Sequence, residues 1–546
     1  MLISRIFSLL VVILFTFNTV TWSAPMHDTL RAMSIKLKDT GDESSFGEDV
    51  RFLQDKLGPN EVIVLTNESG QARVAVVPRY QGRVMTSTAS GDIGTSFGWI
   101  NKRLIASGKT LPHMNPFGGE DRFWMGPEGG QFAIFFPEGA SPDFNFADWQ
   151  TPAVIDTEPF GIEHVSVPDS ASGKINAVSF KRNAEIANYS GTKFKVQIGR
   201  EIRLLDSREV RGALHMELPD GVKVVAYESN NMLTNTDNRT WFKENGLLSI
   251  WILGMYNPSP DTTVIIPFRQ GEESELGPVV NDVYFGKVPS DRLVTKNGVH
   301  FFRGDGQQRG KIGVSPKRAL PVMGSYDAST KTLTIVQYTK DDRNTRYVNS
   351  LWEIQNDPFA GDVANSYNDG APEPGAAPLG PFYELESSSA VRELRPYESI
   401  QHTHRTMHMQ GTEEELDTIA RQVFGVSLEE IKTALPSQTI PELNANPVDY
   451  AAKLETIQTF LKNKGILCGL VSLENMHKPE AEAIINVIIE AQRRGALYVP
   501  EIALRGSTDD VNRALALISK IRKDNPDAII AAGSVSSSEN SRKAVE

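Results

Sequence analysis

The sequence has a single cysteine, Cys468, among its 546 residues. An internal disulfide and a metal site built from several cysteines are therefore both excluded. Histidine is also scarce, with nine residues in the whole chain. The sequence has no glycine-rich nucleotide-binding loop, no HExxH pair and no serine-nucleophile elbow. These absences exclude nucleotide-binding, zinc-peptidase and serine-hydrolase assignments based on those motifs.

An excess of basic charge is missing as well. The formal net charge is −12 and the isoelectric point is about 5.4, which argues against nucleic acid as a partner. Hydrophobic residues make up 40% of the chain and charged residues 23%, as in an ordinary globular protein. At this length we expect two or three domains.

The N-terminus has the layout of a secretory signal peptide, which we place at residues 1–24. Arg5 precedes an apolar run at 6–17, and small and polar residues follow up to Ser23 and Ala24. The run is short for a membrane span, although an uncleaved anchor is the alternative. We expect an exported protein, periplasmic or extracellular, with no stable membrane association after cleavage.

Hydrophobic periodicity changes twice along the rest of the chain. Residues 25–60 predict two helices, at 27–38 and 46–57, and 61–411 form a long series of short segments rich in β-branched residues. So many strands predict one large antiparallel β-supersandwich. Residues 412–435 predict two short closing helices, and 436–447, with three prolines, predict a linker.

Residues 448–546 have a different pattern, in which three helical segments alternate with three short apolar segments. Alternation of this kind predicts parallel βα units. The predicted fold class is therefore mainly β, a supersandwich followed by a partial α/β segment that resembles a fragment of a (βα) barrel.

The densest group of ionisable residues lies between Phe382 and Gly411. Glu384 and Glu386 share one face of a predicted strand. After an intervening turn, a second predicted strand carries a row of three histidines, namely His402, His404 and His408. A hairpin would bring the carboxylates and imidazoles together. Three interpretations remain open for the histidines: a metal site, proton transfer on a sugar, or an ordinary strand face. Arg405 alternates with them, and Arg405 and His408 are further candidate sugar-binding residues, whereas His402 and His404 are candidates for catalysis.

Two further motifs provide candidate sugar-binding groups. The segment GGEDRFW at 118–124 combines charged hydrogen-bonding residues with aromatic ones, which suits the hydroxyls and C–H faces of a sugar. The segment NSYNDG at 365–370 is an ordinary turn or part of the same site. Trp149 and Trp352 are stacking platforms or core residues. The candidate binding residues in the two motifs are Glu120, Asp121, Arg122, Trp124, Asn365, Tyr367, Asn368 and Asp369.

Residues 47–435 resemble the galactose mutarotase-like superfamily, on the motifs at 118–136 and 357–370 and on the late Glu-bearing strand. The resemblance implies a β-supersandwich that binds sugars. It also implies a late glutamate as general base, either Glu384 or Glu386, and a mid-chain histidine as general acid, His164. No metal or other cofactor is expected.

Residues 448–546 resemble the aldolase family that cleaves 2-keto-3-deoxy-6-phosphogluconate or ketohydroxyglutarate, on the motifs EIALRG and PDAIIAAGSV. The resemblance maps the acid/base residue to Glu501 and a substrate-binding residue to Arg505. It places Ser472 where the family has an arginine, and the strand that carries the Schiff-base lysine is missing. Without that amine the aldol reaction has no nucleophile.

These observations together predict an exported protein that binds or modifies a carbohydrate, with sugar epimerisation or other acid/base chemistry as the enzymatic form. A glycan-binding module without catalysis is one alternative. A lyase that acts through the C-terminal segment is the other.

Overall fold

The computed structural model describes residues 44–168, 171–372 and 376–436, together with three short strands between residues 469 and 533. The chain divides into two compact units, residues 1–45 and 46–546. The predicted signal peptide and the first predicted helix lie outside the described residues. None of the described helices is long and apolar enough to cross a membrane.

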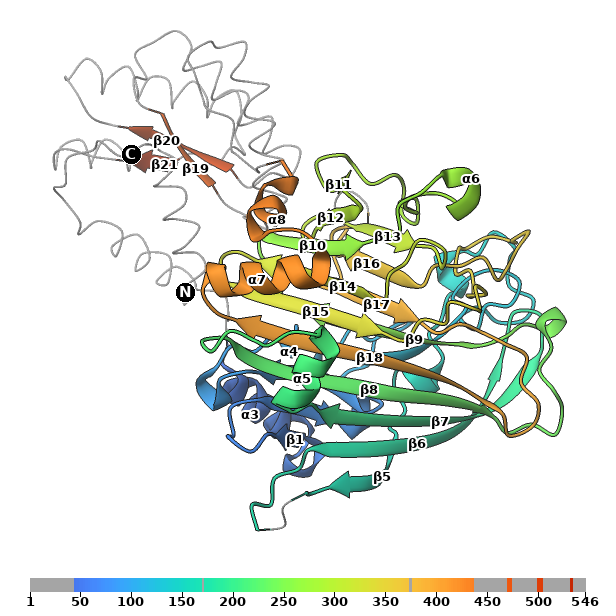
Figure 1. The fold of residues 1–546 in the computed structure, drawn as a ribbon. Coiled ribbons are helices and arrows are strands. Elements are labelled where there is room, and N and C mark those ends of the chain that lie inside the picture. The colour runs from blue at the N-terminus through green and yellow to red at the C-terminus, as the bar shows by residue number, and fades with distance from the viewer. Residues whose placement is uncertain are drawn as a thin grey trace, which may run out of the picture. The chain divides into compact units, whose positions relative to one another are not determined.

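The largest element of the fold is a sheet of ten antiparallel strands (Figure 1). Its order is β11-β12-β10-β14-β15-β18-β8-β7-β6-β5. The bounds along the chain are β5 Gly161–Ser166, β6 Ala177–Ala187, β7 Lys193–Leu204, β8 Lys223–Asn235, β10 Thr262–Pro267, β11 Leu293–Lys296, β12 Val299–Arg303, β14 Val322–Asp327, β15 Thr332–Tyr338 and β18 Ser399–Gln410.

A second antiparallel sheet has five strands in the order β13-β16-β17-β9-β4. Its strands are β4 Arg122–Gly126, β9 Ser249–Tyr256, β13 Gly310–Val314, β16 Ala364–Asn368 and β17 Tyr383–Ser388. Side chains from the two sheets form common apolar clusters, one of which joins Leu385 of the smaller sheet to Val264 and Val336 of the larger one. The described residues therefore form a mainly β, antiparallel sandwich, as the sequence predicts.

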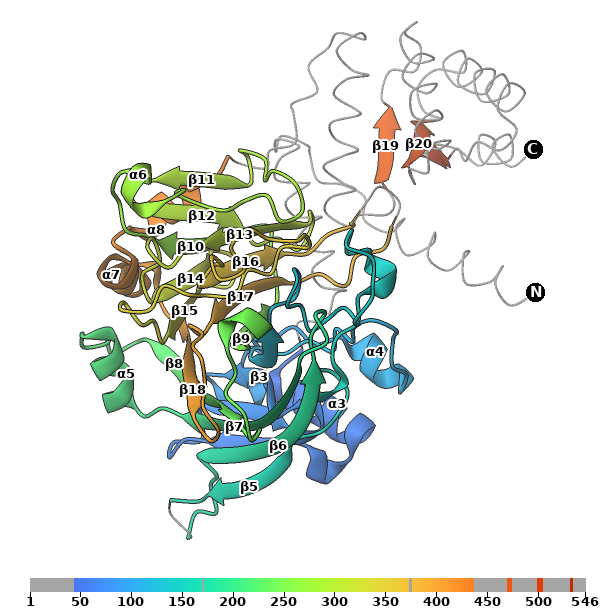
Figure 2. The same cartoon turned by 90° about the vertical axis from the view of Figure 1, so that its right-hand side faces the viewer.

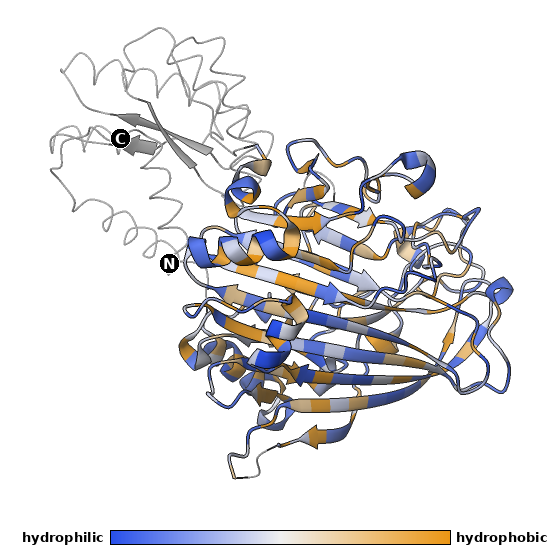
Figure 3. Cartoon of the chain, in the orientation of Figure 1, coloured by the Kyte–Doolittle hydropathy of each residue, from blue (hydrophilic) through white to orange (hydrophobic). Residues whose placement is uncertain are grey.

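Alternation along the strands explains why the sheets pack in this way. In β7, buried Phe194, Val196 and Ile198 alternate with more exposed residues such as Lys195 and Gln197. Figure 3 shows hydrophobic and hydrophilic residues alternating along the neighbouring strands. Because strand side chains point to opposite faces in turn, one face enters the core and the other is hydrated.

Helices cover the outer face of the larger sheet. Leu416 and Ile419 of α7 (Glu413–Phe424) pack with Leu333 and Met407 of the sheet, together with residues of α5 (Ser207–Leu214) and α8 (Leu428–Ala434). Both α7 and α8 begin with a capping box, at Thr412 and Ser427, and both lie in the segment 412–435 that is predicted to be helical. A fourth short helix, α6, spans Glu273–Leu276.

A three-stranded sheet, β1 Ile63–Thr66, β2 Arg73–Val77 and β3 Arg83–Thr88, packs against α3 (Phe46–Leu57) and α4 (Lys102–Ser107) (Figure 2). Helix α3 confirms the second of the two helices predicted in 25–60. In the C-terminal segment, β19 (Gly469–Leu473), β20 (Tyr498–Ala503) and β21 (Ala531–Gly533) are parallel, as the alternating pattern predicts.

Candidate functional site

Strand β17 directs Glu384 and Glu386 to the face of the five-stranded sheet that points away from the larger sheet. Tyr383 and Leu385, the alternate residues, enter the core between the sheets. Because side chains alternate along a strand, the two carboxyl groups must lie on the opposite face. The register places Glu386 between Leu253 of β9 and Asn365 of β16.

Neighbouring strands add two cations and two indoles to the same face. Cross-strand pairing places Arg122 and Trp124 of β4, Trp251 of β9 and Lys311 of β13 on this side of the sheet. We call this group the carboxylate face, and it consists of Glu384, Glu386, Arg122, Trp124, Trp251 and Lys311.

Each carboxyl group of the carboxylate face has its own cation. Arg122 Nη2 donates to Glu384 Oε1 over 3.1 Å. Lys311 Nζ donates to Glu386 Oε2 over 2.8 Å, and Trp251 Nε1 donates to the same oxygen over 3.0 Å. The cations also lie over the rings, since the Arg122 guanidinium carbon is 4.2 Å from the Trp124 centroid and Lys311 Nζ is 4.8 Å from that of Trp251.

The two glutamates differ in their environments. Burial raises the pKa of Glu384 to about 8, Arg122 lowers it in part, and the charge of Glu386 together with a hydrogen bond to Glu386 raises it again. Near neutral pH, Glu384 is therefore a carboxylic acid, whereas one oxygen of Glu386 accepts bonds from both Lys311 and Trp251. A neutral carboxylic acid beside a second carboxyl group is an arrangement that suits general acid/base chemistry.

Half-buried residues border the carboxylate face. Burial raises the pKa of Glu128. Lys311 and a hydrogen bond from Trp352 lower this pKa, and the charge of Glu386 raises it, so Glu128 is a neighbour of these groups. Tyr284 lies under Lys311 Nζ at 5.5 Å and donates to Asp362 Oδ2 over 2.5 Å. Glu128, Trp352, Tyr284 and Asp362 are all half-buried.

Three buried polar atoms of the carboxylate face have incomplete hydrogen bonding. Arg122 Nε and Trp124 Nε1 have no acceptor among the described residues, and Glu386 Oε1 receives no N–H or hydroxyl donor from them. A hydrogen bond between the carboxyl groups of Glu384 and Glu386 is one of the causes of the raised pKa of Glu384. Buried polar atoms are normally paired, so this face can accept a ligand that has both donors and acceptors.

The histidine row does not join this site, and the predicted hairpin is wrong. Strand β18 pairs with β15 and β8 in the larger sheet, whereas β17 pairs with β9 and β16 in the smaller one. His402 Nε2 and His404 Nδ1 lie 2.7 and 2.8 Å from the Ser387 hydroxyl, on the core side of β17. Burial lowers their pKa values to about 3 and 4, so both rings are neutral.

His408 belongs to a separate network between the sheets. Its Nε2 is 3.0 Å from Glu120 Oε2, which also accepts bonds from the hydroxyls of Tyr227 and Ser87. Thr334 contacts the other ring nitrogen of His408. These residues are fully or almost fully buried, so Glu120 and His408 stabilise the core and do not line the carboxylate face.

The segment 118–124 therefore serves two sides of one sheet. Glu120 lies in the core, and Asp121 forms a fully buried ion pair with Arg200 at 2.6 Å. Arg122 and Trp124 alone belong to the carboxylate face. These residues are neighbours in the sequence, but alternation along the strand directs their side chains to opposite faces of the sheet.

The segment 365–370 divides in the same way. Asn365 donates to the Tyr284 hydroxyl over 3.2 Å, and the Tyr367 hydroxyl donates to Asp369 Oδ1 over 2.7 Å, on the side of the carboxylate face. Burial raises the pKa of Asp369 to about 6. Asn368 instead bonds to Asp305 and to the backbone of Gln308. Among the described residues, no group of His, Cys, Asp and Glu has the geometry of a metal site.

Two other predicted residues lie on the larger sheet. His164 is exposed on β5, the edge strand, and so is not placed beside Glu384. Arg405 forms an ion pair with Glu228 at 2.8 Å and contacts Gln337, on the helix-bearing side of the sheet. In the C-terminal segment, Glu501 is paired in register with Ser472, and Arg505 lies outside the described residues.

Sequence reasoning missed four residues of the site: Lys311, Trp251, Glu128 and Tyr284. Lys311 and Glu386 are 75 positions apart, and nothing in either segment indicates their pairing. Trp251 stands in an otherwise apolar strand, where it resembles a core residue. Glu128 could have been predicted, because it lies in the motif at 118–136 beside a pair of glycines.

Comparison with known protein families gives one match, the family of unknown function DUF6786, over residues 44–435. The chain belongs to this family. The match covers both sheets, the carboxylate face and the helices α7 and α8, and it ends before the C-terminal strands. No curated protein matches the chain.

Several solved structures are similar to the chain at low identity. A protein of Synechocystis sp. PCC 6803 has a TM-score of 0.38 and 10% identity, over 64% of this chain and 96% of its own. A galactose mutarotase-like protein of Lactobacillus casei scores 0.35 at 11% identity, over 64% and 99%. A putative aldose 1-epimerase of Escherichia coli scores 0.35 at 10% identity, also over 64% and 99%. The assignment of a β-sandwich rests on the sheets of the chain itself.

Proposed function

We propose that the protein binds a carbohydrate at the carboxylate face and that Glu384 and Glu386 act on it as an acid/base pair. The observation that carries this proposal is a pair of carboxyl groups on one face of β17, Glu384 with a raised pKa and Glu386 bonded to Lys311 and Trp251. Indoles pack against the C–H faces of sugars, and carboxyl and guanidinium groups bond to hydroxyls. The resemblance of residues 47–435 to the mutarotase-like superfamily supports the same class of ligand.

The chemistry that suits this pair is interconversion of the anomers of a reducing sugar. The Glu386 carboxylate accepts the proton of the anomeric hydroxyl while the bond between the anomeric carbon and the ring oxygen breaks. Glu384 donates its proton to the ring oxygen, and an open-chain aldehyde results. Reversal of both transfers after rotation of the aldehyde gives the other anomer. Lys311 and Arg122 hold the two carboxyl groups in place.

Anomer exchange measured by NMR on a panel of monosaccharides tests this proposal. We expect Glu386→Gln to lower the exchange rate by about 100-fold or more, as for loss of a general base, while saturation-transfer signals from the bound sugar persist. Glu353→Gln is the matched control, because Glu353 is exposed and lies next to Trp352. Exchange unchanged by Glu386→Gln would remove the catalytic role.

A glycan-binding module without catalysis is the second candidate. It is favoured by the burial of both carboxyl groups, since Glu384 is 5% exposed and Glu386 is 0% exposed. A sugar then reaches them only if the half-buried border at Glu128 and Trp352 moves. Binding of a glycan without any anomer exchange would select this candidate, and absence of binding across the panel would reject both.

We also propose that residues 1–24 direct export. The support is the sequence layout alone, with Arg5, the apolar run at 6–17 and the small residues before position 25. N-terminal sequencing of the protein secreted or released from the periplasm is expected to begin near Pro25. Retention of residue 1 in a membrane fraction would support the uncleaved anchor instead.

A further inference from the structure

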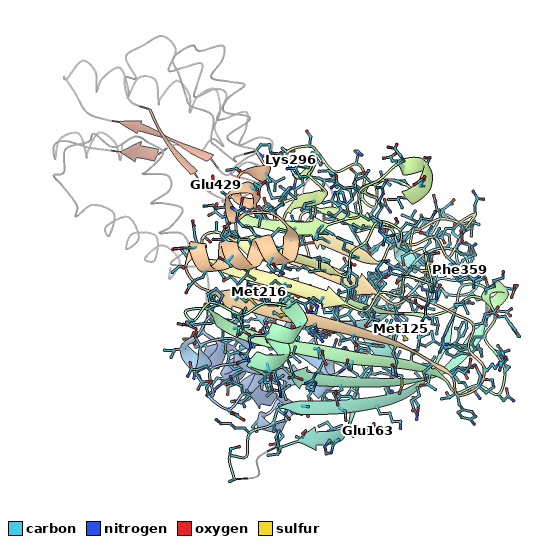
Figure 4. The ribbon with its side chains drawn as sticks, viewed as in Figure 1. Met125, Glu163, Met216, Lys296, Phe359 and Glu429 are labelled. Atoms are coloured by element: carbon cyan, nitrogen blue, oxygen red, sulfur yellow. The ribbon has the colours of Figure 1, made fainter. Side chains whose placement is uncertain are left out.

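The larger sheet has an edge strand, β5, that covers only part of its neighbour β6. Pairing between them runs from Ala177 to Lys181, where Gly161 of β5 meets Lys181. Residues 182–187 of β6 still pair with β7 on their other side. Figure 1 shows β6 continuing beyond the end of β5, and Figure 4 labels Glu163 on β5.

The uncovered part of β6 is bounded at both ends. At one end, Arg182 forms an ion pair with Glu158, just before β5 begins. At the other, Tyr189 N donates to the backbone oxygen of Ala133 over 2.7 Å. Among the described residues, no backbone group of another segment bonds to 182–187 on the side that β5 leaves.

A groove of about 710 Å³ fills this gap, which is within the usual size range of ligand sites. All six residues from 182 to 187 line it along one side, and the segments 134–137 and 148–154 line it along the other. Six residues of extended strand span about 20 Å. In an antiparallel ladder about half of them direct their N–H and C=O groups to the free side.

We propose that this free edge of β6 binds an extended peptide segment of another protein, as an added antiparallel or parallel strand. Six consecutive strand residues along one wall favour this occupant over a sugar, because their unpaired backbone groups have the spacing of another strand. The proposal does not depend on the carbohydrate proposed for the carboxylate face.

The side chains of the groove define the chemistry of the peptide. On the inner face of β6, Ala184 and Ile186 pack with the apolar core, so alternate peptide residues facing them are apolar. On the outer face, Glu185 is exposed. Asp148 and Glu158 also line the groove, against the single cation Arg182. The remaining peptide residues are therefore lysine or arginine.

The test uses a labelled peptide in which Lys and Val alternate over about eight residues, long enough to cover the edge. Backbone hydrogen exchange of the wild-type protein is compared with and without the peptide. We expect slower exchange within residues 182–187, and loss of binding when proline replaces the central valines, since proline cannot complete a ladder.

The charge preference has its own variants. Glu185→Gln is expected to weaken the peptide about two- to fivefold, as for a partly exposed ion pair. Glu163→Gln is the matched control. Like Glu185 on β6, Glu163 on β5 is exposed and ion-paired, but Glu163 lies outside the groove. A peptide with Glu in place of Lys is expected to bind more weakly than the Lys peptide.

Several outcomes overturn the proposal. Unchanged exchange at 182–187 with the peptide in excess removes the added strand. Equal binding of the Glu and Lys peptides removes the charge complementarity. Protection of the same amides by a neutral oligosaccharide would make the groove a glycan site. Protection that appears on self-association alone, detected by light scattering, would make it an interface between two copies of this chain.

Discussion

Replacing Glu384 with glutamine removes a buried carboxyl group whose pKa is raised to about 8. In the unfolded chain this carboxyl has its ordinary pKa of about 4.5. Between these values the folded protein holds a proton that the unfolded chain has lost. The stability that Glu384 contributes is therefore complete below pH 4.5, and it is lost as the pH rises through the folded-state pKa.

The window from pH 6.5 to 8 isolates this effect. Above pH 6.5 the buried His402 and His404 are neutral in the folded protein and largely neutral in the unfolded chain, because burial lowers their folded-state pKa values. One proton difference over 1.5 pH units, at about 1.4 kcal/mol per unit, corresponds to about 2 kcal/mol. Between pH 6.5 and 8, the free energy of unfolding of the wild type should therefore fall by about 2 kcal/mol more than that of the Glu384→Gln variant.

Urea unfolding followed by tryptophan fluorescence at several pH values measures the difference directly. Glu353→Gln, at an exposed site, should follow the wild-type profile. Parallel profiles for wild type and Glu384→Gln across pH 6.5–8 would refute the assignment of a protonated Glu384. They would also leave the proposed acid/base pair without its acid.

Other predictions concern the core. Below pH 6.5, the stability contributed by neutral His402 is lost as the pH falls, by about 2 kcal/mol down to pH 5. The free energy of unfolding of His402→Gln should therefore depend less on pH between 6.5 and 5. Asp121→Asn leaves the fully buried Arg200 unpaired and should cost about 3–5 kcal/mol in urea unfolding; a loss under 1 kcal/mol would contradict this. Gly212→Ala, within helix α5 and in open space, should stabilise by about 0.5–1 kcal/mol, whereas Gly118→Ala, whose Cβ would lie 2.1 Å from a backbone oxygen, should lower the melting temperature.

The sequence predicts the sandwich because each strand can be recognised from residues close together in the chain. Alternating residues such as those of β7, and turns between short apolar segments, carry the information within about ten positions. The capping boxes at Thr412 and Ser427 are equally local, and both helices begin where expected. Pairing of strands far apart in the chain has no such signal.

That difference explains which parts of the site could be predicted. Glu384 and Glu386 share a face through a spacing of two, which is visible in the sequence. Their partners Arg122 and Lys311 lie 262 and 75 positions away, and only the strand order brings them together. The predicted hairpin is wrong for the same reason, since β17 and β18 are adjacent in the sequence and belong to different sheets.

The two indoles of the carboxylate face give the protein a built-in optical reporter. The rings of Trp124 and Trp251 lie 5.4 Å apart at an interplanar angle of 75°, and one of them donates its N–H to Glu386. Transition dipoles this close and this strongly inclined couple, and their coupling produces a signed near-ultraviolet circular dichroism signal. Titration of Glu384, or binding of a ligand at the carboxylate face, would change that signal without any added label.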